Sequence, residues 1–268
     1  MSSNVSISDI FRLDDKIAVV TGGCGNLGPY WTIALIEAGA DVAIIDLPSM
    51  KLPVILKKYS QKQLKAYSGD ITNLTNLKTI HEQIKRDFGK VGILVNNAGI
   101  DAPPVINDVD INVIKRNDLF EKMWEVNVQG MVNCIEEFYP DMEKKRRGSI
   151  INIGSLYGER SSYEGLYTHL DFDKPWIYGA TKAALHNVTM HYATRLAKYG
   201  VRVNTLSPGG LYNNQDKEFV RKFSERVPLG RMAQKETDLN GPLVFLASDA
   251  SSYVTGINLE VNGGYTAW

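Results

Sequence analysis

Short apolar runs and longer stretches with helical periodicity alternate along the chain. Apolar runs bounded by glycine, asparagine or aspartate are typical of buried strands, and apolar positions three and four apart are typical of amphipathic helices. The predicted strands cover 16–21, 41–46, 63–67, 92–96, 149–153, 201–206 and 257–261. One predicted helix follows the first glycine-rich turn to position 39, and the others cover about 50–59, 73–88, 118–145, 176–199 and 237–247.

This alternation predicts an α/β fold, a single doubly wound parallel-sheet Rossmann domain with helices on both faces. The chain has 268 residues, and no linker, internal repeat or low-complexity segment interrupts the pattern. We therefore expect one dinucleotide-binding catalytic domain over 1–268.

The first predicted strand ends in a glycine-rich turn that contains Gly22, Asn26, Leu27 and Gly28. Glycines let the backbone approach a pyrophosphate, and the N-terminus of the following helix offers amide donors and a positive dipole. Asp46 closes the second predicted strand, where a carboxylate accepts hydrogen bonds from an adenosine ribose and repels a 2′-phosphate. No arginine or lysine lies in the turn, so the sequence favours NAD over NADP. The alternative for Asp46 is a turn former at a strand end.

Tyr178 and Lys182 lie four residues apart in a predicted helix, so both side chains project from one face. A phenol is a poor acid or base at neutral pH, but a neighbouring ammonium stabilises the phenolate and lowers the pKa of the phenol. A general acid or base works best when its pKa lies near the operating pH. We therefore expect Lys182 to lower the pKa of Tyr178. The alternative is a ring in the core beside a solvated amine.

Composition and charge argue against several classes of partner. Thirty Lys and Arg balance thirty Asp and Glu, so nothing indicates a nucleic-acid or membrane-surface partner. The basic run 144–147 precedes Gly148 and is expected to close a helix C-terminus. Cys24, Cys134 and the four histidines lack metal-ligand spacing, so no metal site is predicted. With no signal-peptide or membrane-length apolar segment, we expect a cytoplasmic protein.

Taken together, the residues resemble the short-chain dehydrogenase/reductase family, in its compact single-domain branch. The resemblance covers nearly the whole chain from about Asp14. It rests on Thr21-Gly22 with Gly28, Asp70, Asn96-Asn97-Ala98-Gly99, Asn127, Ser155, Tyr178 with Lys182, and Pro208-Gly209, in this order. A weaker likeness, at 207–210 and 265–268, is to a bacterial subgroup associated with cell-surface sugars.

The resemblance implies a role for each matching position. Tyr178 would exchange a proton with the substrate oxygen while hydride passes to or from the nicotinamide. Lys182 would lower the pKa of Tyr178 and bind the nicotinamide ribose. Ser155 would hydrogen-bond the reacting oxygen, and Asn127 would hold a water of a proton relay. The implied cofactor-binding set is Gly22, Asn26, Leu27, Gly28, Asp46, Asp70, Ile71, Asn97, Ala98, Gly99, Tyr178, Lys182, Pro208, Gly209 and Leu211.

The sequence departs from the family pattern at three places. Asn26 replaces the middle glycine of the turn, and asparagine tolerates left-handed backbone. Asn213 stands where the family often has a threonine that binds the nicotinamide carboxamide, which puts that contact in doubt. The gap between Ser155 and Tyr178 is longer than usual. Members of the family commonly form tetramers, so a homo-oligomer, either a tetramer or a dimer, is also expected.

Two segments are expected to contact the substrate at the carboxyl edge of the sheet, where ligands bind in open α/β folds. The insertion, 157–175, carries Glu159, Arg160, Tyr163, Tyr167, His169 and Asp171, and the lid, 211–231, carries Arg221, Lys222, Arg226 and Arg231. Aromatic rings among charged groups suit a polyhydroxylated ligand, and the lid cations could meet a phosphate or carboxylate. The alternatives are an oligomer contact or a solvated loop for the insertion, and a solvated helix face for the lid cations.

The sequence thus predicts an NAD-dependent oxidoreductase that interconverts a secondary alcohol and a ketone of a small molecule, a sugar or sugar derivative. The alternative enzyme is a 3-oxoacyl-thioester or carbonyl reductase, against which stand the polar insertion and the absence of a basic signal for NADPH. A second alternative is a non-catalytic dinucleotide-sensing protein, which would have no need of Ser155, Tyr178 and Lys182 together.

Overall fold

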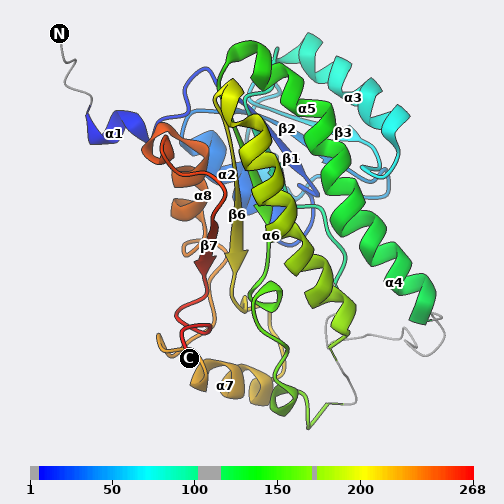
Figure 1. Cartoon of the computed structure of the whole chain (residues 1–268), viewed down its shortest axis with the longest axis vertical. Coiled ribbons are helices and arrows are strands. Elements are labelled where there is room, and N and C mark those ends of the chain that lie inside the picture. The colour runs from blue at the N-terminus through cyan, green and yellow to red at the C-terminus, as the bar shows by residue number, and fades with distance from the viewer. Residues whose placement is uncertain (1–5, 102–115, 171–173) are drawn as a thin grey trace.

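A parallel sheet of seven strands forms the centre of the computed structural model (Figure 1). The structure describes residues 6–101, 116–170 and 174–268. The strands are β1 (Ile17–Thr21), β2 (Asp41–Asp46), β3 (Leu64–Ser68), β4 (Ile93–Asn96), β5 (Gly148–Ile153), β6 (Val201–Pro208) and β7 (Asn258–Val261). Their spatial order is β3-β2-β1-β4-β5-β6-β7. The order reverses between β1 and β4, and ligands of open α/β sheets bind at such a switch point.

Helices cover both faces of the sheet, which confirms the predicted fold class. They are α1 (Ile7–Ile10), α2 (Gly28–Glu37), α3 (Leu74–Asp87), α4 (Arg116–Trp124), α5 (Met131–Lys145), α6 (Trp176–Leu196), α7 (Lys217–Glu225) and α8 (Asn240–Ala247). Ile80 of α3, Phe138 of α5 and Leu185 of α6 share one apolar cluster with the sheet. Trp31 of α2 and Leu243 of α8 belong to the cluster on the opposite face. Within the described ranges, no helix combines the length and the apolarity needed to cross a membrane.

The helix predicted over 50–59 is wrong. This segment contains a single 3₁₀ turn, Val54–Leu56, which the chain enters from Pro53 in extended conformation (φ −57°, ψ 145°). A proline disfavours helical backbone in the residue before it, so Leu52 opposes a helix that would begin near position 50. Val54 is exposed and Leu56 is buried, and Leu52 and Tyr59 pack against the same core cluster, so the segment is anchored without helical periodicity.

The long helix predicted over 118–145 is present but is interrupted by a π-helical segment, Glu125–Gly130. The wider turn lies between α4 and α5 and contains the buried Asn127. π-Bulges of this kind occur frequently at functional sites, because they redirect a side chain without ending the helix. At the end of the segment, a Cβ on Gly130 would lie 2.6 Å from Ile71 Cδ1, so a larger residue there would require the Ile71 side chain to move.

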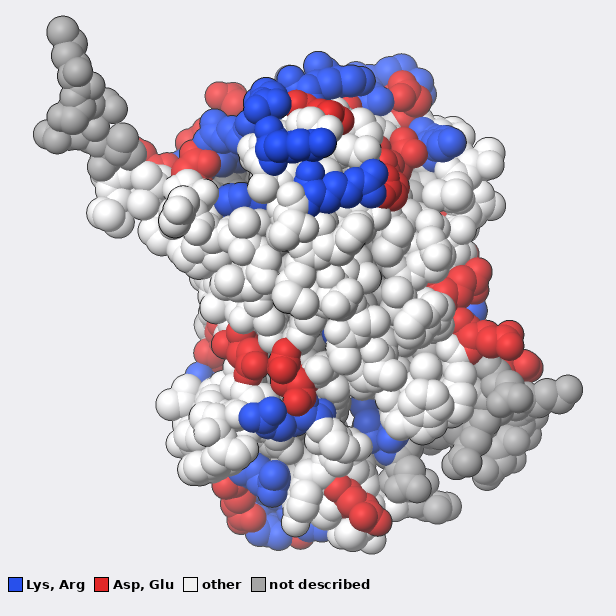
Figure 2. Space-filling view, in the orientation of Figure 1, with Lys and Arg blue, Asp and Glu red and all other residues white. Residues whose placement is uncertain are grey.

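The basic run closes α5 as predicted, at the edge where the strands begin. The helix ends at Lys145, and Arg146 itself adopts left-handed backbone (φ 53°), so Gly148 is not the capping residue. Figure 2 shows lysine and arginine side chains gathered at this end of the molecule.

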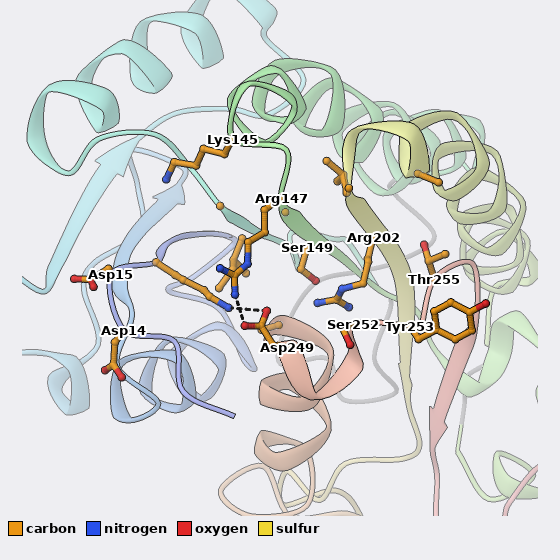
Figure 3. Close-up of a pocket in the computed structure, with 18 residues that line it drawn as sticks. Asp14, Asp15, Lys145, Arg147, Ser149, Arg202, Asp249, Ser252, Tyr253 and Thr255 are labelled. Carbon is orange, nitrogen blue, oxygen red and sulfur yellow. Dashed lines mark hydrogen bonds and ion pairs between the residues drawn. The ribbon is translucent and has the colours of Figure 1, made fainter. Parts of the chain in front are cut away.

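A cavity of about 990 Å³ lies at the same edge (Figure 3). Its Arg147 and Lys16 both pair with Asp249, and Arg202 donates to Ser251 Oγ (2.7 Å) and to the carbonyl of Ser248 (3.0 Å). Burial lowers the pKa of Arg202 to about 10. This cavity lies opposite the carboxyl ends of the strands, and the candidate active site is therefore sought at the other edge.

Candidate active site

The glycine-rich turn is built so tightly that two of its positions require glycine. Gly22 has a positive φ of 61°, and a Cβ there would lie 2.8 Å from Ala98 Cα. A Cβ on Gly28 would lie 2.3 Å from the carbonyl oxygen of Gly22. No side chain caps the N-terminus of α2, which begins at Gly28. Within the first turn of α2, Pro29 has no N–H, and the amides of Tyr30 and Trp31 donate to the carbonyl of Leu27. The Gly28 amide and the helix dipole are therefore what this end offers a pyrophosphate.

Asn97 braces this turn from the end of β4. Its Nδ2 donates to the carbonyls of Thr21 (3.0 Å) and Gly22 (2.9 Å), and its Oδ1 accepts from Trp31 Nε1 (2.8 Å). The backbone N–H of Ala98 donates to Thr21 Oγ1 at 3.1 Å. These bonds engage the amide of Asn97 with protein atoms, so Asn97 positions the turn and the backbone of 97–99 faces the cofactor space.

Asp46 lies at the end of β2, beside the glycine-rich turn. Its Oδ2 accepts a hydrogen bond from the N–H of Cys24 (2.7 Å), and its Oδ1 accepts one from the N–H of Leu47 (2.8 Å). Burial and the Asp46 carboxylate raise the pKa of the Cys24 thiol to about 11, so Cys24 is protonated at neutral pH. The carboxylate keeps lone pairs for two ribose hydroxyls, because each oxygen can accept more than one hydrogen bond.

The structure gives Asn26 a different role from the one expected. Asn26 is not among the residues with positive φ, so tolerance of left-handed backbone does not explain it. Its Oδ1 instead accepts a hydrogen bond from Lys235, which also donates to Asn213 Oδ1. Both acceptors are neutral amides, and Lys235 has no carboxylate within ion-pair distance in the described part of the chain. Sequence analysis missed Lys235, which lies 209 positions from Asn26 in the chain.

The remaining predicted cofactor residues line the carboxyl edge of the sheet. Asp70 follows β3, and its Oδ1 accepts from the N–H (2.9 Å) and Oγ1 (2.8 Å) of Thr72. Ile71 is buried beside the π-helical segment. Pro208 ends β6, the N–H of Gly209 donates to the carbonyl of Val261 (2.9 Å), and Leu211 pairs with Ala233 in an isolated bridge. These positions surround the space beside the glycine-rich turn.

Asn127 ties the loop after β4 to α6. Its Oδ1 accepts from the N–H of Ile100 (2.7 Å), and its Nδ2 donates to the carbonyl of Ile100 (3.0 Å) and to Thr181 Oγ1 (3.1 Å). A Cβ on Gly99 would lie 3.3 Å from Asn127 Oδ1 and 3.7 Å from Lys182 Nζ. The structure therefore brings Gly99, Asn127 and Lys182 to one place.

Ser155 and Tyr178 lie near each other, and the Ser155 hydroxyl lowers the pKa of Tyr178. Ser155 follows β5, and its Oγ also accepts from the N–H of Tyr157 at 3.2 Å. One helical turn further along α6, Lys182 is buried and donates to the carbonyl of Ile153 at 2.7 Å. The four residues predicted to be catalytic thus converge at the carboxyl ends of β4 and β5.

The expectation that Lys182 lowers the pKa of Tyr178 is not met. Burial raises the pKa of Tyr178, Asp101 raises it further, and the hydrogen bond with Ser155 lowers it. Burial also lowers the pKa of Lys182 to about 8, against the effect of Asp101. The Nζ of Lys182 lies 5.8 Å from the centre of the Tyr178 ring. Desolvation is therefore the largest effect on the pKa of both groups. The spacing of Tyr178 and Lys182 in the sequence does not show how deeply the two side chains are buried.

A second lysine lies against Tyr178, and sequence analysis did not identify it. The Nζ of Lys174 is 4.4 Å from the centre of the Tyr178 ring and forms an ion pair with Asp101. The side chain of Lys174 is only 7% exposed, and that of Asp101 is 43% exposed. Burial lowers the pKa of Lys174, and Asp101 raises it. The two residues are 73 positions apart in the chain, so no local pattern could have paired them.

The insertion and the lid pack against each other beyond the end of β6 (Figure 1). Leu166 and Tyr167 of the insertion share an apolar cluster with Phe219 and Phe223 of α7. His169 contacts Asp216 Oδ1 at 2.8 Å across the same boundary. The described part of the insertion is therefore packed against the lid through Leu166 and Tyr167, while much of its polar surface is exposed.

The polar residues of these two segments have partners within the chain. Glu159 pairs with His186 of α6, Arg160 donates to the carbonyl of Thr266, and Tyr167 shares a hydrogen bond with Tyr157. The Arg226 guanidinium lies 3.9 Å from the centre of the Tyr163 ring. Asp171 lies outside the described residues.

Comparison with known proteins identifies the class to which this geometry belongs. The family model for short chain dehydrogenases matches residues 16–222. A sorbose reductase from Candida albicans is 32% identical over 271 residues, which cover 97% of this chain and 90% of the reductase. The chain belongs to the short-chain dehydrogenase/reductase family. It is an oxidoreductase that acts on CH–OH groups with a nicotinamide dinucleotide.

Solved structures of the family include close matches to the whole chain. One is a gluconate 5-dehydrogenase from Burkholderia cenocepacia in complex with NADP and tartrate, with a TM-score of 0.84, 28% identity, and coverage of 98% of this chain and 100% of that chain. Another is a short chain dehydrogenase from Leptospira borgpetersenii with bound NAD⁺, with a TM-score of 0.83, 29% identity, and coverage of 99% and 98%. Related structures thus hold either dinucleotide.

The buried Lys182 generates a prediction about stability. The pKa of Lys182 falls from 10.5 to about 8 on folding, which corresponds to roughly 3 kcal/mol against the folded state when the amine is charged in both states. This cost is complete below pH 8 and is relieved as pH rises from about 8 to 10.5. Lys182→Met should therefore raise the free energy of unfolding of the ligand-free protein at pH 7 by up to roughly 3 kcal/mol, with a smaller gain at pH 10.

Urea unfolding at pH 7 and pH 10 measures this difference. Lys198→Met, which removes an exposed lysine just beyond α6, is the matched control and should change little at either pH. Equal effects of the two variants, or a gain from Lys182→Met that grows with pH, would contradict the assignment.

Proposed function

We propose that the protein is an NAD-dependent dehydrogenase/reductase that interconverts a secondary alcohol and a ketone of a sugar or sugar derivative, with Tyr178 as the acid/base. The observation that carries this proposal is the convergence of Ser155, Tyr178 and Lys182 at the carboxyl end of β5, where Lys182 Nζ donates to the carbonyl of Ile153 at 2.7 Å and lies 5.8 Å from the centre of the Tyr178 ring. Two hydroxyl groups that converge on one point can bind the single oxygen of a carbonyl or alcohol.

The residues at the switch point fit a dinucleotide. The backbone of Gly22 and the Gly28 amide at the start of α2 would hold the pyrophosphate, with Lys235 supplying a cation at the rim of the turn. Asp46 would accept hydrogen bonds from the adenosine ribose. The Lys182 amine would contact the nicotinamide ribose. When bound, the dinucleotide supplies the hydride acceptor or donor.

Residues of the protein then carry out the proton transfer. Tyr178 is protonated in this state of the protein, because its pKa is raised, and it can donate to the oxygen of a ketone. Alcohol oxidation requires the opposite transfer, to the phenolate, so the rate of oxidation should rise with pH. Ser155 donates a second hydrogen bond to the reacting oxygen and stabilises its charge. Asn127, fixed through Ile100 and Thr181, would anchor a water next to Lys182.

We assign substrate binding to the insertion, 157–175, and the lid, 211–231. Their hydroxyl-bearing rings and charged pairs favour a polar substrate over an acyl thioester, which would need an apolar channel. The sorbose reductase and the gluconate 5-dehydrogenase, which match nearly the whole chain, support a sugar-like substrate. A pure dinucleotide sensor would not require the Ser155–Tyr178 pair. A cytoplasmic homo-oligomer, with the edge strand β7 at a subunit contact, is part of the same proposal.

Removal of the Tyr178 hydroxyl tests the catalytic assignment. Tyr178→Phe should lower kcat by roughly 10²–10⁴-fold, because the ring remains and only the proton carrier is lost. The affinity for NAD should stay within a few-fold. Both are measured from NADH absorbance and from dinucleotide titration. Tyr192→Phe, on the same helix but bonded to Glu136, is the control and should keep its activity. Retained turnover in Tyr178→Phe would refute the role.

Cofactor preference depends on Asp46 in this proposal. Asp46→Ala should weaken NAD binding and reduce discrimination against NADP by roughly tenfold or more, because the ribose acceptor and the charge that repels the 2′-phosphate are both lost. Asp46→Asn removes the negative charge but keeps an oxygen that can accept the hydrogen bond from the N–H of Cys24. It therefore separates the loss of charge from the loss of the hydrogen bond that holds the glycine-rich turn. The ratio of kcat/KM for NAD and NADP is the measurement, and an unchanged ratio in both variants would exclude Asp46 as the ribose partner.

A further inference from the structure

The ion pair between Lys174 and Asp101 lies directly on the proposed proton carrier. Lys174 is the second residue before α6, and its Nζ lies 4.4 Å from the centre of the Tyr178 ring and 5.8 Å from that of the Tyr157 ring. Asp101 follows Ile100, whose backbone is held by Asn127. The ammonium of this pair therefore lies against the ring of Tyr178, and its carboxylate follows a residue that Asn127 holds in place.

We propose that this pair makes the pocket selective for uncharged polyols and ketoses over sugar acids and sugar phosphates, an inference that rests on the proposed function. A buried ammonium that is paired with a carboxylate attracts an anionic substrate less than an ammonium without that carboxylate would. An anionic group that approaches Tyr178 meets the carboxylate of Asp101 as well as the ammonium of Lys174. A hydroxyl group both donates and accepts hydrogen bonds, so a diol next to the reacting carbon can contact Asp101 as donor and Lys174 as acceptor.

The lid cations that could have bound an anion are engaged elsewhere. Arg221 bonds with Glu218 and Glu225 at 2.6 Å each, and Arg231 bonds with Asp238 at 2.5 Å.

The other two lid cations face the insertion and the C-terminal segment. Lys222 donates to Thr168 Oγ1 at 3.1 Å and contacts His169 Nδ1 at 3.2 Å. Arg226 lies over the Tyr163 ring and donates to Tyr265 Oη at 3.3 Å. The four lid cations singled out from the sequence thus hold the lid to itself and to neighbouring segments. Among the described residues, the charged groups against Tyr178 are therefore Lys182 and the Lys174–Asp101 pair.

Matched substrates that differ in charge at one terminal carbon test the inference. The pairs are D-glucitol with D-gluconate, galactitol with D-galactonate, and D-mannitol with D-mannonate, each with NAD and with NADP. For the wild-type protein we expect kcat/KM to favour the hexitol of the best pair by at least about tenfold. Preference for the aldonate, with activity intact, would overturn this inference alone. Turnover of none of the six compounds with either cofactor would count against the proposed function itself.

Asp101→Asn removes the carboxylate charge that compensates the Lys174 ammonium, and asparagine has nearly the same shape as aspartate. The ratio of kcat/KM for aldonate to hexitol should rise by at least about tenfold. Because Asp101 raises the pKa of Tyr178, the limb of the pH–rate profile for hexitol oxidation should also move to lower pH. A purely structural role would not produce this shift.

Glu82→Gln is the matched control, because it removes one negative charge from α3, outside the proposed site, and frees Lys85 from one partner. It should leave both the ratio of kcat/KM for aldonate to hexitol and the pH limb unchanged. A ratio that rises equally in Glu82→Gln and Asp101→Asn would overturn the inference, because net charge alone would then explain the change. If Asp101→Asn does not fold, the ratio of kcat/KM for hexitol to aldonate in the wild-type protein still tests the inference.

Discussion

The amide of Asn127 is the contact on which the geometry of the site depends. It satisfies both the N–H and the carbonyl of Ile100 and reaches Thr181 of α6. Buried backbone groups of a loop have few other ways to be satisfied, and an unpaired one costs about 1–3 kcal/mol. The π-helical turn directs Asn127 inward, so one side chain fixes the loop after β4 against the helix that carries Tyr178 and Lys182.

The functional groups of this site are held against their electrostatic preference. Burial raises the pKa of Tyr178 and lowers that of Lys182, so each is pushed towards its neutral form. The apolar sheet and its two helical layers supply the stability that tolerates this cost. Such a conflict is expected where a protein must change the protonation of one group during turnover, because a site at its electrostatic optimum would resist that change.

Local sequence patterns predicted the fold, the glycine-rich turn and the Tyr178–Lys182 pair, because these signals act over short distances along the chain. Ser155 and Asn127 were identified through the resemblance to the family. The helix over 50–59 was wrong because apolar spacing was weighed above the local effect of Pro53. Lys235 beside Asn26 and Lys174 beside Asp101 could not be predicted, since each pair joins segments that only the tertiary fold brings together. The pKa of Tyr178 was misjudged for a related reason, because burial is a property of the packed site.

Asp101 affects both the net charge near Tyr178 and the pKa of Tyr178. Its carboxylate compensates the charge of Lys174 and also raises the pKa of Tyr178. A change of charge at this position therefore alters which substrates are attracted and, in the same step, the pH at which Tyr178 can accept a proton. Under the proposed function, a change at Asp101 that favours an anionic substrate would also shift the pKa of Tyr178. Substrate charge and working pH are thus linked through a single carboxylate.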